Sequence, residues 1–369
     1  MQDVFNDPSV IAAYAAERDR PGDGDAQLEA LDWEEGLQYP VSRVLPVEDV
    51  AHSRPLLRVL FPELNRPNSR FADGLLLLAK HYSIPSAFLE GEVRAVTHSF
   101  GSLDTKDGYR CCWFNYLCKN ITVAEVPGCE PVIADPRPGQ YKRHSDYTWV
   151  RAGFFLRWRI ESKGSPDVTL LCFGGHMVRD RFLSLSYDAV KNGVIRDPLS
   201  LFVLVLHELS AQMDSTVWDL SRVFGTIEFK ALGLDRERES FTGLHNISKH
   251  IIYLQESSDA ALETTKNLSN YHDDLSPRST EEERAAGRVT RRTITQVEAE
   301  FQTVKLRLRS LDRRMKNVIA LSFHLVTQEG NEFLNADSNT MATIAFVTLI
   351  FLPITTVSPI FQHGLRRLP

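Results

Sequence analysis

The chain has 369 residues, of which 43% are hydrophobic and 24% are charged, and its formal net charge is -6. A mildly acidic chain without a dense Lys/Arg tract binds nucleic acid poorly, so the composition argues against a nucleic-acid partner. From the usual length of domains we expect two or three of them.

Residues 1–40 are expected to form an acidic lead-in, with a short helix over Pro8–Arg20. The start of the chain carries Asp3 and Asp7 and has no apolar run of signal-peptide length, so we expect no secretory signal. The segment Pro21–Asp25 resembles a calcium loop but lacks the twelve-residue ligand pattern, which favours a solvated loop.

Residues 41–195 alternate short apolar runs with turn residues, which predicts a mixed α/β domain. Ser69–Tyr82 is expected to be a helix, because its apolar residues recur at helical spacing. A second helix is expected over Met177–Val190. The expected strands are Val41–Leu45, Leu56–Phe61, Arg94–Phe100, Arg110–Leu117, Trp149–Ile160 and Val168–Phe173.

The chain contains five cysteines and no CxxC pair. This odd set is typical of reduced, partly buried thiols in a cytosolic domain. A zinc site built from Cys111, Cys118 and a histidine is the alternative, although the spacing matches no common pattern. The five residues are Cys111, Cys112, Cys118, Cys129 and Cys172.

Residues 196–340 are expected to form a helical stalk. Asp197-Pro198 is a helix-start signal, and the first helix should run to about Lys230. A second helix should cover about Phe241–Leu268, followed by a mobile, highly charged loop over residues 272–293. From Thr295 the chain carries a heptad seam, which predicts a long stalk helix. The seam consists of Val297, Phe301, Val304, Leu308, Leu311, Met315 and Val318.

Residues 341–361 read MATIAFVTLIFLPITTVSPIF and contain no charged side chain. A helix of this length rises roughly 31 Å, which matches the hydrocarbon core of a bilayer. We therefore predict a transmembrane helix here, with residues 362–369 as a short tail; a buried core helix is the alternative. Pro353 and Pro359 are tolerated better in membrane helices than in soluble ones.

The segment Ile350–Thr355 is similar to the I-F-x-P-x-T signature in the first transmembrane helix of the CorA family of divalent-cation channels. Together with the layout of the chain, it resembles the divergent CorA-like proteins of fungi. The resemblance covers roughly residues 90–361, and Phe351 and Pro353 are its sharpest positions. It implies an α+β fold: an N-terminal mixed α/β cytosolic domain, a long helical stalk and one C-terminal transmembrane helix.

The resemblance also implies a pentamer whose first transmembrane helices line a pore for passive transport of Mg²⁺ or another divalent cation. Apolar rings would gate by dewetting, while threonine hydroxyls would contact the hydrated ion. The matching pore-lining positions are Met341, Ile344, Thr348, Leu352 and Thr355.

Two features depart from the family pattern. The family's Gly-Met-Asn filter corresponds here to Gln362, His363 and Gly364, none of which matches. The second transmembrane helix is also absent, so we interpret the chain as truncated after the first, either as a gene product or through a gene-model artefact. These departures keep open a non-conducting regulatory or scaffold subunit that joins full-length family members as a hetero-oligomer.

Two arguments on topology disagree. Arg366 and Arg367 follow the span, and the positive-inside rule applied locally would place them in the cytosol. A large folded domain without a signal peptide is, however, not expected to cross the membrane. We therefore expect an integral membrane protein whose N-terminal domain is cytosolic.

Catalytic motifs are incomplete, and we expect no enzyme. His207-Glu208 begins a zincin motif without its second histidine, and the glycines before His176 lack a P-loop lysine. Family members hold regulatory cations through carboxylates of the cytosolic domain. The candidates of that type on the first long helix are Glu208, Asp214, Asp219 and Glu228.

Overall fold

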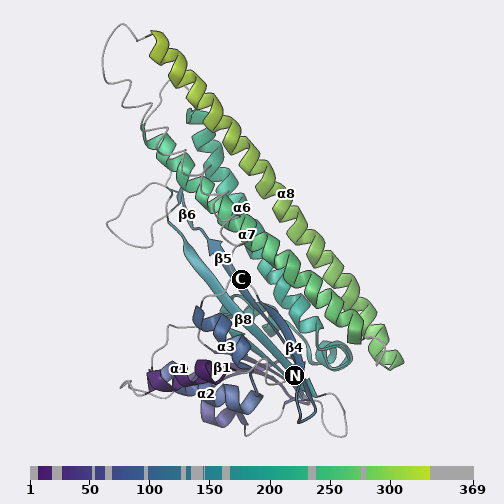
Figure 1. Ribbon diagram of the computed structural model, residues 1–369. Helices are drawn as coiled ribbons and strands as arrows, with labels where there is room; N and C mark the ends of the chain where they lie inside the picture. The colour runs from purple at the N-terminus through teal and green to yellow at the C-terminus, as the bar shows by residue number, and fades with distance from the viewer. Residues whose placement is uncertain are drawn as a thin grey trace, which may run out of the picture.

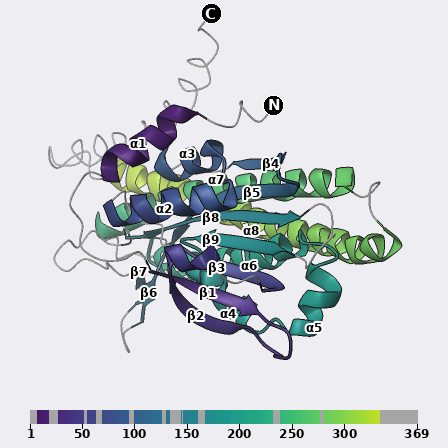
Figure 2. The same cartoon turned by 90° about the horizontal axis from the view of Figure 1, so that it is seen from below.

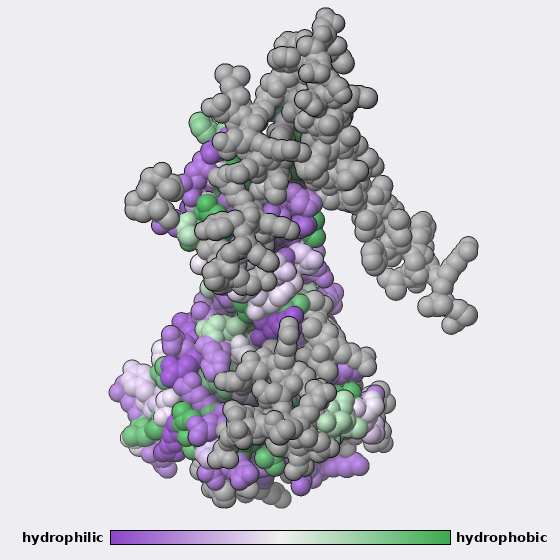
Figure 3. All heavy atoms as spheres, turned by 90° about the vertical axis from the view of Figure 1, so that its left-hand side faces the viewer, coloured by the Kyte–Doolittle hydropathy of each residue, from purple (hydrophilic) through white to green (hydrophobic). Residues whose placement is uncertain are grey.

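A seven-stranded sheet and three long helices make up most of the fold (Figure 1). The computed structural model describes residues 7–18, 27–51, 55–62, 69–94, 99–125, 130–133, 144, 146–159, 167–231, 238–275 and 280–332. On the face seen in Figure 3, hydrophilic and hydrophobic residues of the sheet domain are interspersed.

The sheet has the strand order β2-β1-β3-β9-β8-β5-β4, and only the β3–β9 pair is parallel. Its longest ladder joins β5 to β8, both rich in aromatic residues, which suit a pleated surface. The strands are β1 (Gln27–Trp33), β2 (Val41–Pro46), β3 (Leu57–Phe61), β4 (Phe100–Asp104), β5 (Tyr109–Asn120), β8 (Thr148–Arg159) and β9 (Val168–Phe173). Separately, β6 (Val123–Ala124) pairs with β7 (Val132–Ile133).

Each face of the sheet has its own core, because successive strand residues point to opposite faces. Trp113, Phe155 and Phe173 pack with the helices α1 (Pro8–Arg18), α2 (Ser69–Tyr82) and α3 (Ser86–Arg94). Phe114 and Phe154 join the opposite core, which the long helices complete. Figure 2 shows α1, α2 and α3 gathered on one side of the sheet.

A buried ion pair joins two neighbouring strands. Asp32 of β1 lies directly opposite Arg58 of β3, and the two side chains are 0% and 3% exposed. Arg58 Nε and Nη2 donate to the two carboxylate oxygens at 2.7 and 2.8 Å, and Nη1 donates to the carbonyl oxygen of Val50. This two-pronged geometry is the strongest form of such a pair.

The three long helices are α6 (Ser200–Ala231), α7 (Arg238–Leu275) and α8 (Glu281–Glu332). All seven seam residues from Val297 to Val318 are buried, which confirms the heptad seam. The helix-start signal is also confirmed, because Asp197 Oδ1 accepts the backbone N–H of Leu199 at 3.2 Å, as an N-cap side chain does.

The prediction of a mobile loop over residues 272–293 is wrong. The structure continues α7 to Leu275 and begins α8 at Glu281, with residues 276–279 outside the described part. Thr280 and Glu283 form a capping box: each backbone N–H donates to the other residue's side-chain oxygen, at 2.7 and 3.3 Å. This reciprocal cap and the acidic first turn stabilise a helix start in a segment of low hydrophobicity.

Three further expectations differ from the structure. The acidic lead-in contains β1, whose Leu31 and Trp33 are fully buried. The strand expected over Arg94–Phe100 is wrong, because Arg94 ends α3 and β4 begins at Phe100. The helix expected over Met177–Val190 is broken, and the Trp33 indole N–H donates to the carbonyl oxygen of Leu185 in the break. The broken segment contains η3 (His176–Val178), α4 (Arg179–Leu183), α5 (Tyr187–Ala189) and the π-helical turn η4 (Val190–Val194).

Candidate functional site

The pore-lining positions taken from the resemblance lie outside the described residues, so they stay predictions. The same holds for the signature residues and for the degenerate filter. Among the residues that the structure describes, no helix is long and apolar enough to span a bilayer. The positions concerned are Met341, Ile344, Thr348, Phe351, Leu352, Pro353, Thr355, Gln362, His363 and Gly364.

The candidate regulatory carboxylates are spread along α6 rather than gathered. From Glu208 to Glu228 the helix rises roughly 30 Å. Asp214 pairs with Arg307, Glu228 with Arg314, and Asp219 Oδ1 accepts from Arg222 Nη2 at 2.7 Å. Over the described ranges, no group of three or more His, Cys, Asp or Glu side chains could hold a metal ion.

Two of these ion pairs, Asp214–Arg307 and Glu228–Arg314, instead join α6 to α8, whereas Asp219–Arg222 lies within α6. Two of the pairs use arginines of α8, and a third contact lies nearer the sheet, where Glu300 Oε2 is 2.9 Å from His207 Nδ1 and accepts from Ser210 Oγ at 2.7 Å. His207 of the incomplete zincin motif therefore contacts a carboxylate of α8. The carboxylates Asp214, Glu228 and Glu300 serve interhelical contacts in this structure.

The described cysteines are free thiols buried in the sheet. Burial raises the pKa of Cys111 to about 12 and that of Cys118 to about 11, so both are protonated at neutral pH. Their side chains belong to opposite cores, Cys111 on the α2 side and Cys118 on the α6 side. A zinc site that contains both is therefore wrong, because they occupy opposite faces of β5.

A lysine in an aromatic cage joins the sheet to α7. Lys119 Nζ lies 3.8 Å from the ring centroids of Tyr147 and Tyr253 and 5.4 Å from that of Trp149. Burial, with the nearby charge of Lys249, lowers the pKa of Lys119 to about 8. The cage offsets part of the cost of burying this cation through contacts with the aromatic faces.

His250 of α7 lies beside this cage and is expected to make stability depend on pH. Its Nε2 is 2.9 Å from the backbone oxygen of His144. Burial, with the charges of Lys119 and Lys249, outweighs that hydrogen bond and lowers the pKa of His250 to about 4. The unfolded chain takes up this proton near pH 6.5, so the folded state should lose on the order of 2–3 kcal/mol between pH 6.5 and pH 4.

Urea denaturation of the His250→Gln variant between pH 7 and pH 4 checks this expectation. The variant should lose less stability on acidification than the unmodified chain, because it has no proton to take up at this position. His324→Gln, on an exposed part of α8, is the control for the loss of a histidine from the chain. Parallel pH profiles for the His250→Gln variant and the unmodified chain would contradict the assignment.

A cleft of about 720 Å³ lies where one end of the sheet meets the start of α6, the end of α7 and the start of α8. We call it the arginine cleft, because seven arginines line it: Arg110, Arg159, Arg196, Arg284, Arg288, Arg291 and Arg292. Four carboxylates also line it: Asp104, Asp197, Asp273 and Glu283. The lining residues alone have a formal excess of three positive charges, and Glu281 and Glu282, the partners of Arg284 and Arg196, reduce it to one.

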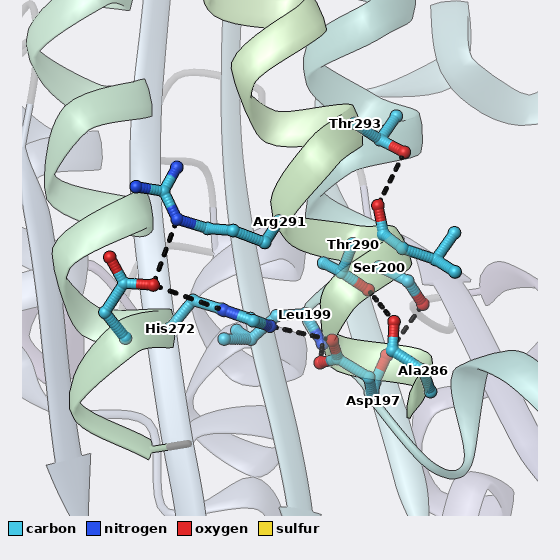
Figure 4. A network of polar contacts seen from close by, with 10 residues as sticks. Asp197, Leu199, Ser200, His272, Ala286, Thr290, Arg291 and Thr293 are labelled. Carbon is cyan, nitrogen blue, oxygen red and sulfur yellow. Dashed lines mark hydrogen bonds and ion pairs between the residues drawn. The ribbon is translucent and has the colours of Figure 1, made fainter. Parts of the chain in front are cut away.

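A polar network with a buried His272–Asp197 pair and an exposed Arg291–Asp273 pair holds one wall of the arginine cleft (Figure 4). His272 Nε2 of α7 is 2.9 Å from Asp197 Oδ2, and the two side chains are 7% and 9% exposed. Arg291 Nε of α8 donates to Asp273 Oδ1 at 3.0 Å. Asp197 also caps the start of α6, so the network ties all three long helices together at this end.

The arginines of the cleft differ in their partners. Arg110, Arg196, Arg284 and Arg291 each contact a carboxylate, at 3.0–3.5 Å. Arg159 Nη2 donates to the Tyr109 hydroxyl at 2.8 Å. Arg288 and Arg292 have no ion pair within the part of the chain that the structure describes.

The sequence alone did not indicate this cleft. Its arginines on α8 lie in the segment predicted to be a mobile loop, whereas Arg110 and Arg159 come from distant strands and Arg196 precedes α6. The capping-box pattern Thr280–Glu283 would have placed Arg284, Arg288 and Arg291 on one helix face, since residues three and four apart are neighbours.

Comparisons with known protein sequences give a partial match. No family model matches the chain. It is 29% identical over 243 residues to "Notoamide biosynthesis cluster protein M'" of Aspergillus versicolor, a match to 60% of this chain and 52% of that protein. The chain thus spans about half the length of the curated relative that it matches.

Among solved structures, the CorA magnesium transporter from Methanocaldococcus jannaschii superimposes with a TM-score of 0.51. The superposition covers 93% of this chain and 88% of that one, at 14% sequence identity. The full-length CmaX protein gives a TM-score of 0.49 at 12% identity, over 95% and 89% of the two chains. The match to the CorA magnesium transporter shows that the mixed α/β domain and long helices described above have a CorA-like fold.

Proposed function

We propose that this chain is a subunit of a CorA-like membrane protein that passes Mg²⁺, or another divalent cation, down its electrochemical gradient. The observation that carries the proposal is the CorA-like fold over nearly the whole chain. The long helix α8 ends at Glu332, shortly before the uncharged residues 341–361. In this proposal the chain is a divergent, fungal-type member, α8 is the stalk, and residues 341–361 are the transmembrane helix.

The proposed transport needs several copies of the chain around one axis, as a pentamer. Positions 341, 344, 348, 352 and 355 share one helix face, so each would form a ring in such an assembly. Mg²⁺ releases its water reluctantly, and the hydroxyl rings of Thr348 and Thr355 would therefore contact the hydrated ion. The apolar rings, of which Leu352 is one, would close the pore by excluding water.

Flux measurements on full-length chain reconstituted in liposomes with a trapped Mg²⁺-sensitive dye test the proposal. We expect saturable Mg²⁺ entry driven by an inside-negative potential. Leu352→Ala should raise the flux several-fold, because it widens an apolar ring. Phe346→Ala, on the opposite helix face, should leave it within about twofold. Absence of flux at every Mg²⁺ concentration would overturn conduction by this chain.

A second candidate is a non-conducting regulatory or scaffold subunit. The observation that favours it is the pairing of Asp214 and Glu228 with arginines of α8, which occupies two carboxylates that a regulatory cation would need. This candidate predicts co-purification with a conducting relative and no flux from the chain alone. Saturable flux from homomeric assemblies would exclude it.

A further inference from the structure

We infer that the arginine cleft binds a small soluble molecule that carries a diphosphate or triphosphate group. The first support is charge. With Glu281 and Glu282 counted, the cleft keeps one excess positive charge in a chain that is acidic as a whole, and its Arg288 and Arg292 have no carboxylate partner among the described residues. A concave site with an excess of positive charge attracts anions and raises their local concentration.

The second support is the placement of Arg288 and Arg292. They are four residues apart on α8, so they lie one turn from each other on the same face. Like charges at this spacing repel, and neither arginine is paired with a carboxylate among the described residues. A bound anion would contact both and remove this repulsion.

The third support is the wall of the cleft that contains the His272–Asp197 and Arg291–Asp273 pairs. The His272–Asp197 pair is buried, and Arg291 is held by Asp273, so this side of the cleft is fixed by contacts within the protein. Gly287 brings α8 close to the pair, since a Cβ there would lie 3.4 Å from His272 Nε2. A site built on helices and a polar network needs little rearrangement to hold a ligand.

The chemistry and size of the cleft define the ligand class. Guanidinium groups match phosphate oxygens through pairs of parallel hydrogen bonds. Four carboxylates also line the cleft, so a singly charged anion would gain little, and two or more negative charges are needed. A volume of about 720 Å³ is within the range of small-molecule sites and admits a nucleoside triphosphate.

The position of the cleft favours a soluble ligand over a lipid headgroup. Arg288 lies near the start of α8, and the helix rises roughly 65 Å from there to Glu332. If the membrane follows Glu332, the cleft is far from any headgroup. This last step rests on the proposed function, whereas the charge, the volume and the binding measurement do not.

Isothermal titration calorimetry of the full-length chain in mild detergent, at low salt, tests the inference with sodium pyrophosphate and with ATP. We expect saturable binding at one site per chain that weakens as salt is raised. The double variant Arg288→Ala/Arg292→Ala should bind at least about tenfold more weakly, because it loses two charge-assisted contacts. Both side chains are exposed, and circular dichroism should show that the fold is kept.

The matched control is Arg309→Ala/Arg313→Ala, which removes two exposed arginines with the same spacing from the same helix, outside the cleft. It should bind within about twofold of the unmodified chain. An equal loss in the two double variants would overturn the inference, because it would indicate attraction to overall charge alone. Binding to phosphatidic acid vesicles without binding to pyrophosphate or ATP would also overturn it, as would no binding at all. None of these outcomes depends on whether the chain transports ions.

Discussion

Replacing Arg58 by methionine is expected to lower the free energy of unfolding by about 3–5 kcal/mol. The replacement leaves the Asp32 carboxylate fully buried between two central strands, without the two hydrogen bonds that it accepts from Arg58. The nearest other cation is Arg43, whose Nη1 is 3.5 Å from Asp32 Oδ2 and whose side chain is 38% exposed. Urea denaturation of the full-length chain, followed by circular dichroism, measures the change.

The double variant Arg58→Met/Asp32→Leu provides the control. Removing both charges takes away the uncompensated carboxylate, so most of the lost stability should return. A loss below about 1 kcal/mol in the Arg58→Met single variant would show that Arg43 replaces Arg58 as the partner. A double variant no more stable than the single one would show that Asp32 is not the source of the loss.

Replacing Phe301 by alanine is expected to cost about 3–5 kcal/mol. Phe301 is fully buried in the seam of α8, within the core shared with α6 and α7. Removal of the ring leaves a cavity that the surrounding helices fill only in part. The same denaturation measurement should show a lower transition midpoint with little change in its slope.

Gln302, the next residue of α8, is exposed and supplies the matched control. Gln302→Ala should change stability by no more than about 0.5 kcal/mol, because alanine is a good helix former and the side chain is exposed. Equal losses from Phe301→Ala and Gln302→Ala would indicate that the seam packs less tightly than the structure shows.

The sequence predicts those helices and strands in which one pattern of buried residues repeats along the whole element. The seam from Val297 to Val318 is visible because a helix with one buried face repeats its apolar residues at heptad spacing. The strands β8 and β9 are likewise marked by aromatic and β-branched residues. The strand β1 was missed because Asp32 interrupts its apolar pattern, and the partner that neutralises this residue, Arg58, belongs to another strand.

The two candidate sites likewise differ in whether the sequence carries a local signal for them. The pore positions come from a local signature around Phe351 and Pro353, and they stay a prediction. The arginine cleft could not be predicted, because Arg110 and Arg288 approach each other only once the sheet and α8 have folded. The capping box at Thr280–Glu283 is a local signal for a helix start, but the high charge of the segment favours a loop.

The parallel join between β3 and β9 has a consequence for how the chain folds as it is synthesised. Leu57 pairs with Val168, so more than a hundred residues must leave the ribosome before β3 gains its second neighbour. Until then, β1, β2 and β3 form a partial sheet with an open hydrophobic edge. A step that joins residues so far apart in sequence is slow, and the chain is prone to aggregate before it is complete. By contrast, α7 and α8 are adjacent in sequence and can pair quickly once both have been made. Synthesis rate and chaperone access should therefore affect the yield of this protein most while residues 62–168 are being made.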